Sequence, residues 1–154
     1  VVSVATTDHW HVFKTEIATG RVVWSFRWKK TSTLSTPVPC GKDDVVLADL
    51  HGKVSRIHGP TGTVLWQRRL PRVKINTSCY SRAKGCVLCD PVVCGDTLVV
   101  GGADGGLYSF DMESGERLWR LELGSPVNCT VAVGNDALYA ATFDGTVHAL
   151  IPKK

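Results

Sequence analysis

The stretch Ser114-Gly115-Glu116-Arg117-Leu118-Trp119 decides the fold, because the same pattern occurs twice more in the 154-residue chain. The other two copies are Thr19-Gly20-Arg21-Val22-Val23-Trp24 and Thr61-Gly62-Thr63-Val64-Leu65-Trp66. Each copy places a small hydroxyl residue before a glycine, and a tryptophan four residues after that glycine. A motif that recurs in this way indicates a repeat architecture, which has to be recognised before any single motif is interpreted.

An alternating apolar run that ends in a polar turn precedes each copy. The equivalent turn positions are Asp8, His51, Asp104 and, in a fourth unit, Asp144, so the intervals are 43, 53 and 40 residues. β-Branched runs broken by Gly and Asp indicate strands joined by hairpins. In the third unit we expect strands over residues 91–94, 97–102, 106–111 and 117–123. Units of about 40 residues with four antiparallel strands are typical of β-propeller blades.

The predicted fold is therefore all-β, a β-propeller of four-stranded antiparallel blades. Residues 1–154 are expected to form a single partial propeller, with about three and a half to four blades of a ring of about seven or eight. The longest interval is explained by an insertion over residues 75–86, which we expect to be a surface loop and a candidate interaction site. The predicted ranges are 1–30 for blade 1, 35–72 for blade 2, 89–123 for blade 3 and 126–154 for the incomplete blade 4. The candidate interaction residues in the loop are Asn76, Tyr80, Arg82 and Lys84.

The repeated glycines and tryptophans are predicted to be structural. A glycine that follows a hydroxyl residue in a tight turn indicates positive φ, which costs glycine little. A tryptophan on the outermost strand can fill the gap that widens between neighbouring blades away from the ring axis. We expect Gly20, Gly62 and Gly115, with Trp24, Trp66 and Trp119, to dock each blade against the next.

These residues resemble the pyrroloquinoline-quinone (PQQ) repeat family of quinoprotein-like propellers, whose motif is Ala-x-Asp-x-x-Thr-Gly-x-x-x-Trp. The second half of the motif is kept in all three copies, with Ser114 replacing Thr in the third. The Asp is matched by Asp111 only, since Glu16 and His58 stand at the other two positions. The positions of the family's Ala are occupied by Lys14, Arg56 and Ser109.

A narrower resemblance rests on the strands around Cys40 and Cys94 and on the Asp-His-Trp-His turn at residues 8–11. These features are similar to the C-terminal repeat region of β-alanine-activating enzymes, which are adenylate-forming proteins. The resemblance implies a non-catalytic binding or scaffold module that is an accessory part of a larger acyl- or amino-acid-activating enzyme.

The family resemblance leaves two alternatives open. One is a degenerate quinoprotein oxidoreductase. Such enzymes hold PQQ with a calcium ion, a catalytic Asp and a pair of adjacent cysteines, and this chain has no adjacent cysteine pair. Sharing the fold of these enzymes does not imply binding their cofactor, so we expect no cofactor and no catalysis within this segment. The other alternative is an assembly-factor propeller of the periplasm or a lumen.

Six cysteines bear on metal binding and on the compartment: Cys40, Cys79, Cys86, Cys89, Cys94 and Cys129. They form no compact disulfide framework, which favours a reduced, cytoplasmic protein, with a secreted or periplasmic location left open. The spacing of Cys79, Cys86 and Cys89 allows a zinc site or a regulatory disulfide. We favour buried structural thiols, because Cys94 aligns with Cys40 in a blade without such a cluster. His9 and His11 could bind metal, but a solvated turn is the preferred interpretation.

The charge and hydropathy of the chain limit the classes of partner that it is expected to bind. The net charge of +4 comes partly from basic clusters at residues 27–30 and 68–74, but no stacking platform accompanies them, so no nucleic acid is expected. The longest apolar runs are strand-sized, so no membrane span is expected. Blade 1 is predicted to start at its second strand and blade 4 to end at its third. The expected partners are a further protein, the remaining blades of the same chain, or a second copy in a homodimer.

Overall fold

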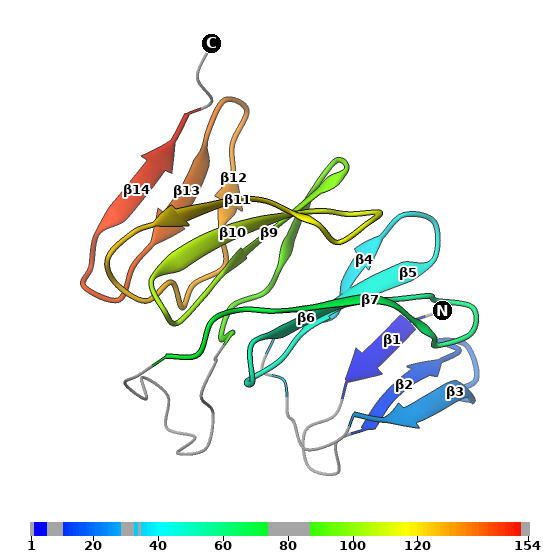
Figure 1. Ribbon diagram of the computed structural model, residues 1–154. Coiled ribbons are helices and arrows are strands. Elements are labelled where there is room, and N and C mark those ends of the chain that lie inside the picture. The colour runs from blue at the N-terminus through cyan, green and yellow to red at the C-terminus, as the bar shows by residue number, and fades with distance from the viewer. Residues whose placement is uncertain (1, 6–10, 29–32, 34, 74–86, 152–154) are drawn as a thin grey trace.

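Four antiparallel β-sheets follow one another in chain order along an arc (Figure 1). The computed structural model describes residues 2–5, 11–28, 33, 35–73 and 87–151, and of residues 2–5 the backbone only. Strands and their connections account for all of these residues, and the described part contains no helix. The chain is an all-β partial propeller, as its sequence predicts.

Each sheet is one blade, with its strands paired in chain order. Blade 1 contains β1 (Val2–Ala5), β2 (His11–Thr15) and β3 (Val22–Arg27). Blade 2 contains β4 (Val38–Cys40), β5 (Asp44–Ala48), β6 (Lys53–Ile57) and β7 (Val64–Arg69). Blade 3 contains β8 (Val92–Cys94), β9 (Thr97–Gly101), β10 (Gly106–Asp111) and β11 (Arg117–Glu122). Blade 4 contains β12 (Ala132–Val133), β13 (Leu138–Ala141) and β14 (Val147–Leu150).

The two end blades differ from the two middle ones in the number of their described strands. The tryptophan-bearing strands β3, β7 and β11 are the outermost strands of the first three blades. By position in the repeat, β1 corresponds to β5, and β14 corresponds to β6 and β10. The described part of blade 1 therefore has no inner strand, and that of blade 4 has no outer strand.

The hydrophobic core lies between the blades. One buried cluster joins blades 1 and 2 and includes Val12, Leu47 and Ile57. The largest cluster joins blades 2 and 3 and includes Trp66 and Tyr108. A third joins blades 3 and 4. Because each blade buries both faces only when it has a neighbour on each side, the end blades have apolar faces without a described partner.

The polar turn that recurs in the sequence is capped by a carboxylate. Asp104 Oδ1 accepts a hydrogen bond from the Gly106 amide at 3.2 Å, and Asp144 Oδ1 accepts one from the Thr146 amide at 3.1 Å. In blade 2, where His51 occupies this position, Asp49 Oδ1 accepts from the amides of His51 and Lys53, both at 2.8 Å. The recurring acidic turn position is thus a capping position at Asp104 and Asp144, while Asp8 lies outside the described residues.

Within the described residues, no helix has the length and hydropathy needed to cross a bilayer.

Candidate functional site: the tryptophan slots between blades

Two of the three motif tryptophans dock on the following blade in the same way. The indole Nε1 of Trp24 donates to the Gly59 carbonyl oxygen at 2.8 Å, and that of Trp66 donates to the Met112 carbonyl oxygen at 2.8 Å. Each acceptor precedes the motif glycine of the next blade by three residues. We call each such arrangement of a tryptophan against the next blade's turn a tryptophan slot.

The motif glycines make these two slots possible. Gly62 and Gly115 have positive φ, 76° and 68°. A Cβ added to Gly62 would lie 2.9 Å from Trp24 Cδ2, and one added to Gly115 would lie 2.6 Å from Trp66 Cδ2. Any larger residue would push the indole out of its slot. Gly20 also has positive φ, 69°, but a Cβ there would meet no described atom within 4 Å.

A cationic side chain accompanies each of the two docked tryptophans. Lys14 lies directly opposite Trp24 on β2, and Arg56 lies opposite Trp66 on β6, so each pair shares one face of its blade. Lys14 Nζ donates to the Gly59 carbonyl oxygen at 2.9 Å, and Arg56 Nη1 donates to the Met112 carbonyl oxygen at 2.9 Å. One turn carbonyl thus accepts two hydrogen bonds from the preceding blade.

Arg56 also forms two ion pairs, one within blade 2 and one with blade 3. Its Nη2 lies 2.7 Å from Asp44 Oδ2 in its own blade, and its Nη1 lies 2.7 Å from Glu113 Oε2 in the next. In the sequence, Lys14 and Arg56 stand out only as departures from the family's alanine. The signal that could have found their role is that both stand at the same register position opposite the tryptophan.

The third slot has the same tryptophan, but no described residue fills it; the position equivalent to Gly59 and Met112 is residue 152, which lies outside the described residues. The Trp119 side chain is 38% exposed, whereas that of Trp66 is 6% exposed. Among the described residues, none accepts a hydrogen bond from Trp119 Nε1. Ser109 lies opposite Trp119 in place of Lys14 and Arg56, and its buried Oγ has no hydrogen-bond partner.

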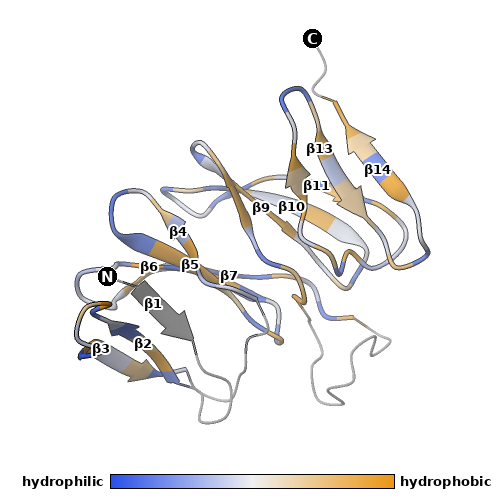
Figure 2. Ribbon diagram, turned by 180° about the vertical axis from the view of Figure 1, so that it is seen from behind, coloured by the Kyte–Doolittle hydropathy of each residue, from blue (hydrophilic) through white to orange (hydrophobic). Residues whose placement is uncertain are grey.

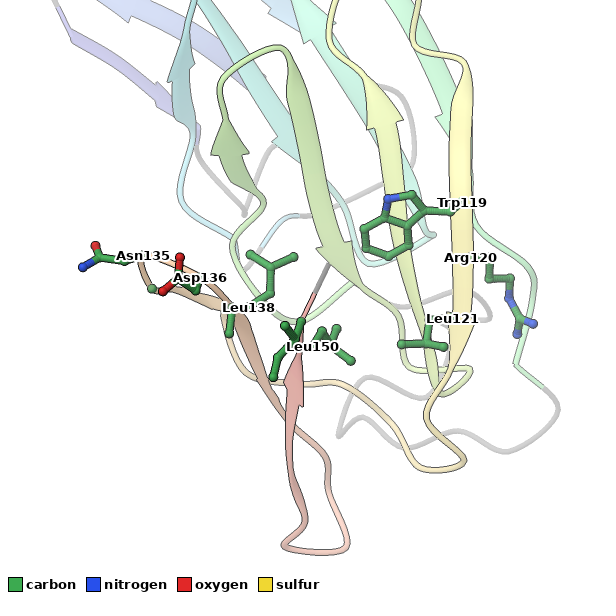
Figure 3. A pocket seen from close by; sticks show the side chains of 10 residues that line it. Trp119, Arg120, Leu121, Asn135, Asp136, Leu138 and Leu150 are labelled. Atoms are coloured by element: carbon green, nitrogen blue, oxygen red, sulfur yellow. The ribbon is translucent and has the colours of Figure 1, made fainter. Parts of the chain in front are cut away.

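An open groove of about 1270 Å³ lies beside Trp119. Trp119 and Leu121 project from β11 toward Leu138 and Leu150 of blade 4, whereas Arg120 points away from the groove (Figure 3). Arg120 is held on the other face of the sheet, where its Nε donates to the Tyr108 hydroxyl at 2.9 Å. The groove is therefore mostly apolar and is bordered by the edge strand β14.

The predicted interaction loop lies outside the described residues. This applies to Asn76, Tyr80, Arg82 and Lys84, to Cys79 and Cys86, and to His9. Their predicted roles, including the zinc and disulfide alternatives, stay predictions. Within the described ranges, no group of three or more His, Cys, Asp or Glu side chains could hold a metal ion. His11 is the first residue of β2, not part of a turn as its sequence suggested.

Of the four described thiols, those of Cys40 and Cys89 are buried, that of Cys94 is partly exposed and that of Cys129 is exposed. Cys89 is buried, its Sγ donates to the Gly101 carbonyl oxygen at 3.4 Å, and burial raises its pKa to about 11. Burial likewise raises the pKa of Cys40 to about 11. Cys94 was expected to be buried like Cys40 but is partly exposed, because it packs into none of the core clusters, whereas Cys40 lies in the cluster between blades 2 and 3.

A comparison with known protein families agrees with the repeated blade geometry. The family described as "Outer membrane protein assembly factor BamB", a family of PQQ-type repeats, matches residues 8–154. The chain belongs to this PQQ-repeat family.

Individual relatives are covered over only part of their own length. The outer membrane protein assembly factor BamB of Escherichia coli is 30% identical over 105 residues, which are 63% of this chain and 26% of the relative. The chain thus spans about a quarter of the curated relative that it matches. The crystal structure of BamB from Moraxella catarrhalis superposes with a TM-score of 0.78 at 21% identity, covering 97% of this chain and 42% of that one.

Quinoprotein enzymes share the fold as well. Quinohemoprotein alcohol dehydrogenase from Comamonas testosteroni has a TM-score of 0.70 at 14% identity, covering 91% of this chain and 27% of that one. At this identity the likeness shows the propeller fold alone, and it transfers neither cofactor nor activity.

Proposed function

We propose that this chain is part of a non-catalytic propeller that works as a protein-binding or scaffold module. The carrying observation is the outer face of blade 4, which we define by Ala132, Tyr139, Ala141, Val147 and Ala149. These residues share one face because Tyr139 is paired with Ala132 and Ala149, and Ala141 with Val147.

Equivalent positions in the middle blades are fully buried by the next blade. Val46 and Val99, which correspond to Tyr139, are 0% and 1% exposed, while Tyr139 is 45% exposed. Val54 and Leu107, which correspond to Val147, are both 0% exposed, while Val147 is 68% exposed. Hydrophobic colour along β14 can be followed in Figure 2. A core-type face left open in this way indicates that another protein surface covers it.

The first setting that we propose for this module is assembly of other proteins at a membrane surface. It is supported by the family match and by the similarity to outer membrane protein assembly factors. This similarity favours the periplasmic location over the cytoplasmic one that the cysteine content suggests. The covering partner would then be further blades of the same protein, a second copy, or a separate protein.

The second setting is an accessory propeller of an adenylate-forming enzyme, which would be cytoplasmic. It rests on the resemblance of the strands around Cys40 and Cys94, which end β4 and β8 at the same position of their blades. The sequence that flanks this chain in its gene distinguishes the two settings.

Analytical ultracentrifugation of the 154-residue chain tests the shared proposal. We expect self-association that depends on concentration, because two open blade faces can cover each other. The double substitution Tyr139→Lys and Val147→Lys should leave a monomer, since a charged face opposes dry contact. Leu118→Lys is the matched control, because Leu118 is 54% exposed but lies on the outer strand of blade 3. A wild-type chain that stays a stable monomer at all concentrations would overturn the proposal.

A further inference from the structure

We propose that Asp44 couples the two complete tryptophan slots, so that docking of blade 1 on blade 2 strengthens docking of blade 2 on blade 3. One carboxylate of the middle blade is hydrogen-bonded both to the acceptor turn of the first slot and to the cationic donor of the second. The inference does not depend on the proposed function, because every residue that carries it lies within blades 1 to 3.

The relay begins at Gly59, the acceptor of the first slot. Its carbonyl oxygen accepts hydrogen bonds from Trp24 and Lys14 of blade 1, at 2.8 and 2.9 Å. Its amide donates to Asp44 Oδ1 at 3.0 Å. Gly59 has no room for a Cβ, because it lies directly against the Asp43 carbonyl oxygen. A shift of this turn is therefore transmitted to Asp44.

The other carboxylate oxygen of Asp44 continues the relay to the second slot. Asp44 Oδ2 accepts from Arg56 Nε at 2.9 Å and lies 2.7 Å from Arg56 Nη2. Two nitrogens of one rigid guanidinium contact the same oxygen, which fixes the plane of the guanidinium. Through Nη1, Arg56 donates to the Met112 carbonyl oxygen at 2.9 Å, and this oxygen also accepts from Trp66. Asp44 thus orients a donor that holds blade 3.

The relay is shielded from water along its length. Lys14 and Asp44 are each 8% exposed, and the Arg56 side chain is 12% exposed. Hydrogen bonds in such surroundings are stronger than in water, and a connected network can contribute more than the sum of its separate bonds. The two donors of blade 1 fix the position of Gly59, and Gly59 in turn fixes the carboxylate that orients Arg56.

Blade 3 has the same positions without the relay. Thr97 pairs with the end of β8 as Asp44 pairs with the end of β4, so the two residues share one register position. The Met112 amide, which corresponds to that of Gly59, donates to the backbone carbonyl oxygen of Asp96 at 2.8 Å. The relay is therefore a feature of blade 2 that the repeat itself does not require.

A double-mutant cycle measures the coupling. Lys14→Met removes the donor of blade 1, and Arg56→Lys keeps the charge of blade 2 but not the fork. Urea unfolding is followed in the chain with Tyr139→Lys and Val147→Lys, so that self-association does not enter. The double variant should lose less of the unfolding equilibrium constant than the product of the two single losses, by about threefold or more, because either substitution breaks the same relay.

Asp44→Asn tests whether the coupling passes through this carboxylate. Asn has one carbonyl oxygen, so it can accept from the Gly59 amide or from Arg56 but cannot repeat the two-sided contact. The cycle repeated in this background should become additive within about twofold.

A second readout needs no unfolding. The ¹⁵N–¹H signal of the Trp66 indole, assigned with Trp66→Phe, should move in the Lys14→Met chain, although no described contact joins Lys14 to Trp66. Arg21→Met is the matched control, because the Arg21 side chain also lies in blade 1 but is 74% exposed and pairs with Glu16. It should leave the Trp66 signal in place.

Additive losses in the cycle overturn the inference, and so does a Trp66 signal that does not move in the Lys14→Met chain. Coupling that persists unchanged with Asp44→Asn also overturns it, because the blades would then be coupled by another route. If Asp44→Asn does not fold, the cycle and the Trp66 signal decide. Self-association of the wild-type chain, which tests the proposed function, does not enter any of these results.

Discussion

The Trp66 slot and the Trp119 slot share one sequence motif but have different environments. Trp66 is buried, donates to the Met112 carbonyl oxygen at 2.8 Å and covers Gly115. Trp119 stands at the same position of the next blade, is 38% exposed and has no described acceptor. The difference shows that the motif supplies only half of each interface. The other half is the turn of the following blade, which for Trp119 begins at residue 152, outside the described residues.

The largest expected effect comes from removing the two tryptophans. Trp66→Ala should lower the free energy of unfolding by about 3–5 kcal/mol, because it leaves a large cavity between blades 2 and 3. Trp119→Ala should cost less than about 1 kcal/mol, since its ring is partly in solvent and has no hydrogen-bond acceptor among the described residues. Urea denaturation followed by circular dichroism measures both. Equal losses for the two variants would contradict the comparison.

A smaller difference should separate two glycines of the same motif. Gly115→Ala should cost about 2 kcal/mol or more, because positive φ is unfavourable for alanine and the Cβ would lie 2.6 Å from Trp66 Cδ2. Gly20→Ala should cost only about 1 kcal/mol, because the same backbone strain applies but no described atom lies within 4 Å. Thermal unfolding of the two variants gives the comparison. A Gly20 variant as unstable as the Gly115 variant would show that backbone strain alone accounts for the recurrence of glycine in the motif.

The smallest effect is on the pH dependence of stability. Burial raises the pKa of Cys40 and Cys89 to about 11 and that of Tyr108 to about 12, and all three lie in the cluster between blades 2 and 3. Because these pKa values are higher in the folded chain, their contribution is fully present below about pH 9 and is lost as the pH rises toward 11–12. Urea midpoints between pH 8 and 11 should therefore fall, and Cys89→Ala should reduce the fall. A flat profile would contradict this explanation of the blade 2–3 core.

The repeat made the fold predictable from the sequence. Expected strands over 91–94, 97–102, 106–111 and 117–123 agree within one residue at each end with β8 to β11. The alternation of apolar and polar residues and the turn glycines are local signals. Aligning the three copies of the motif makes the strand boundaries of each copy more certain. The Asp104 and Asp144 turns were predictable for the same reason, since a carboxylate caps amides two residues away.

The cross-blade contacts were not predictable in the same way. Lys14 and Arg56 donate hydrogen bonds to carbonyl oxygens that lie 45 and 56 residues away in the sequence. No local sequence pattern predicts such a distant acceptor. The open groove at Trp119 depends on whether a further strand pairs with β14, and the motif itself does not encode that pairing. The sequence pattern favours the loop over residues 75–86 as the functional region, whereas the described residues place a groove at Trp119, a residue that the motif identified as purely structural.

Hydrogen exchange of the indole N–H groups is the most direct test of the central claim that the motif is docked twice and has no described acceptor at its third copy. It should be measured by NMR on the monomeric variant with Tyr139→Lys and Val147→Lys, so that self-association cannot cover the slot. We predict slow exchange for Trp24 and Trp66, which donate to turn carbonyls, and exchange near the rate of a free indole for Trp119. Exchange at Trp119 as slow as at Trp66 would contradict this claim.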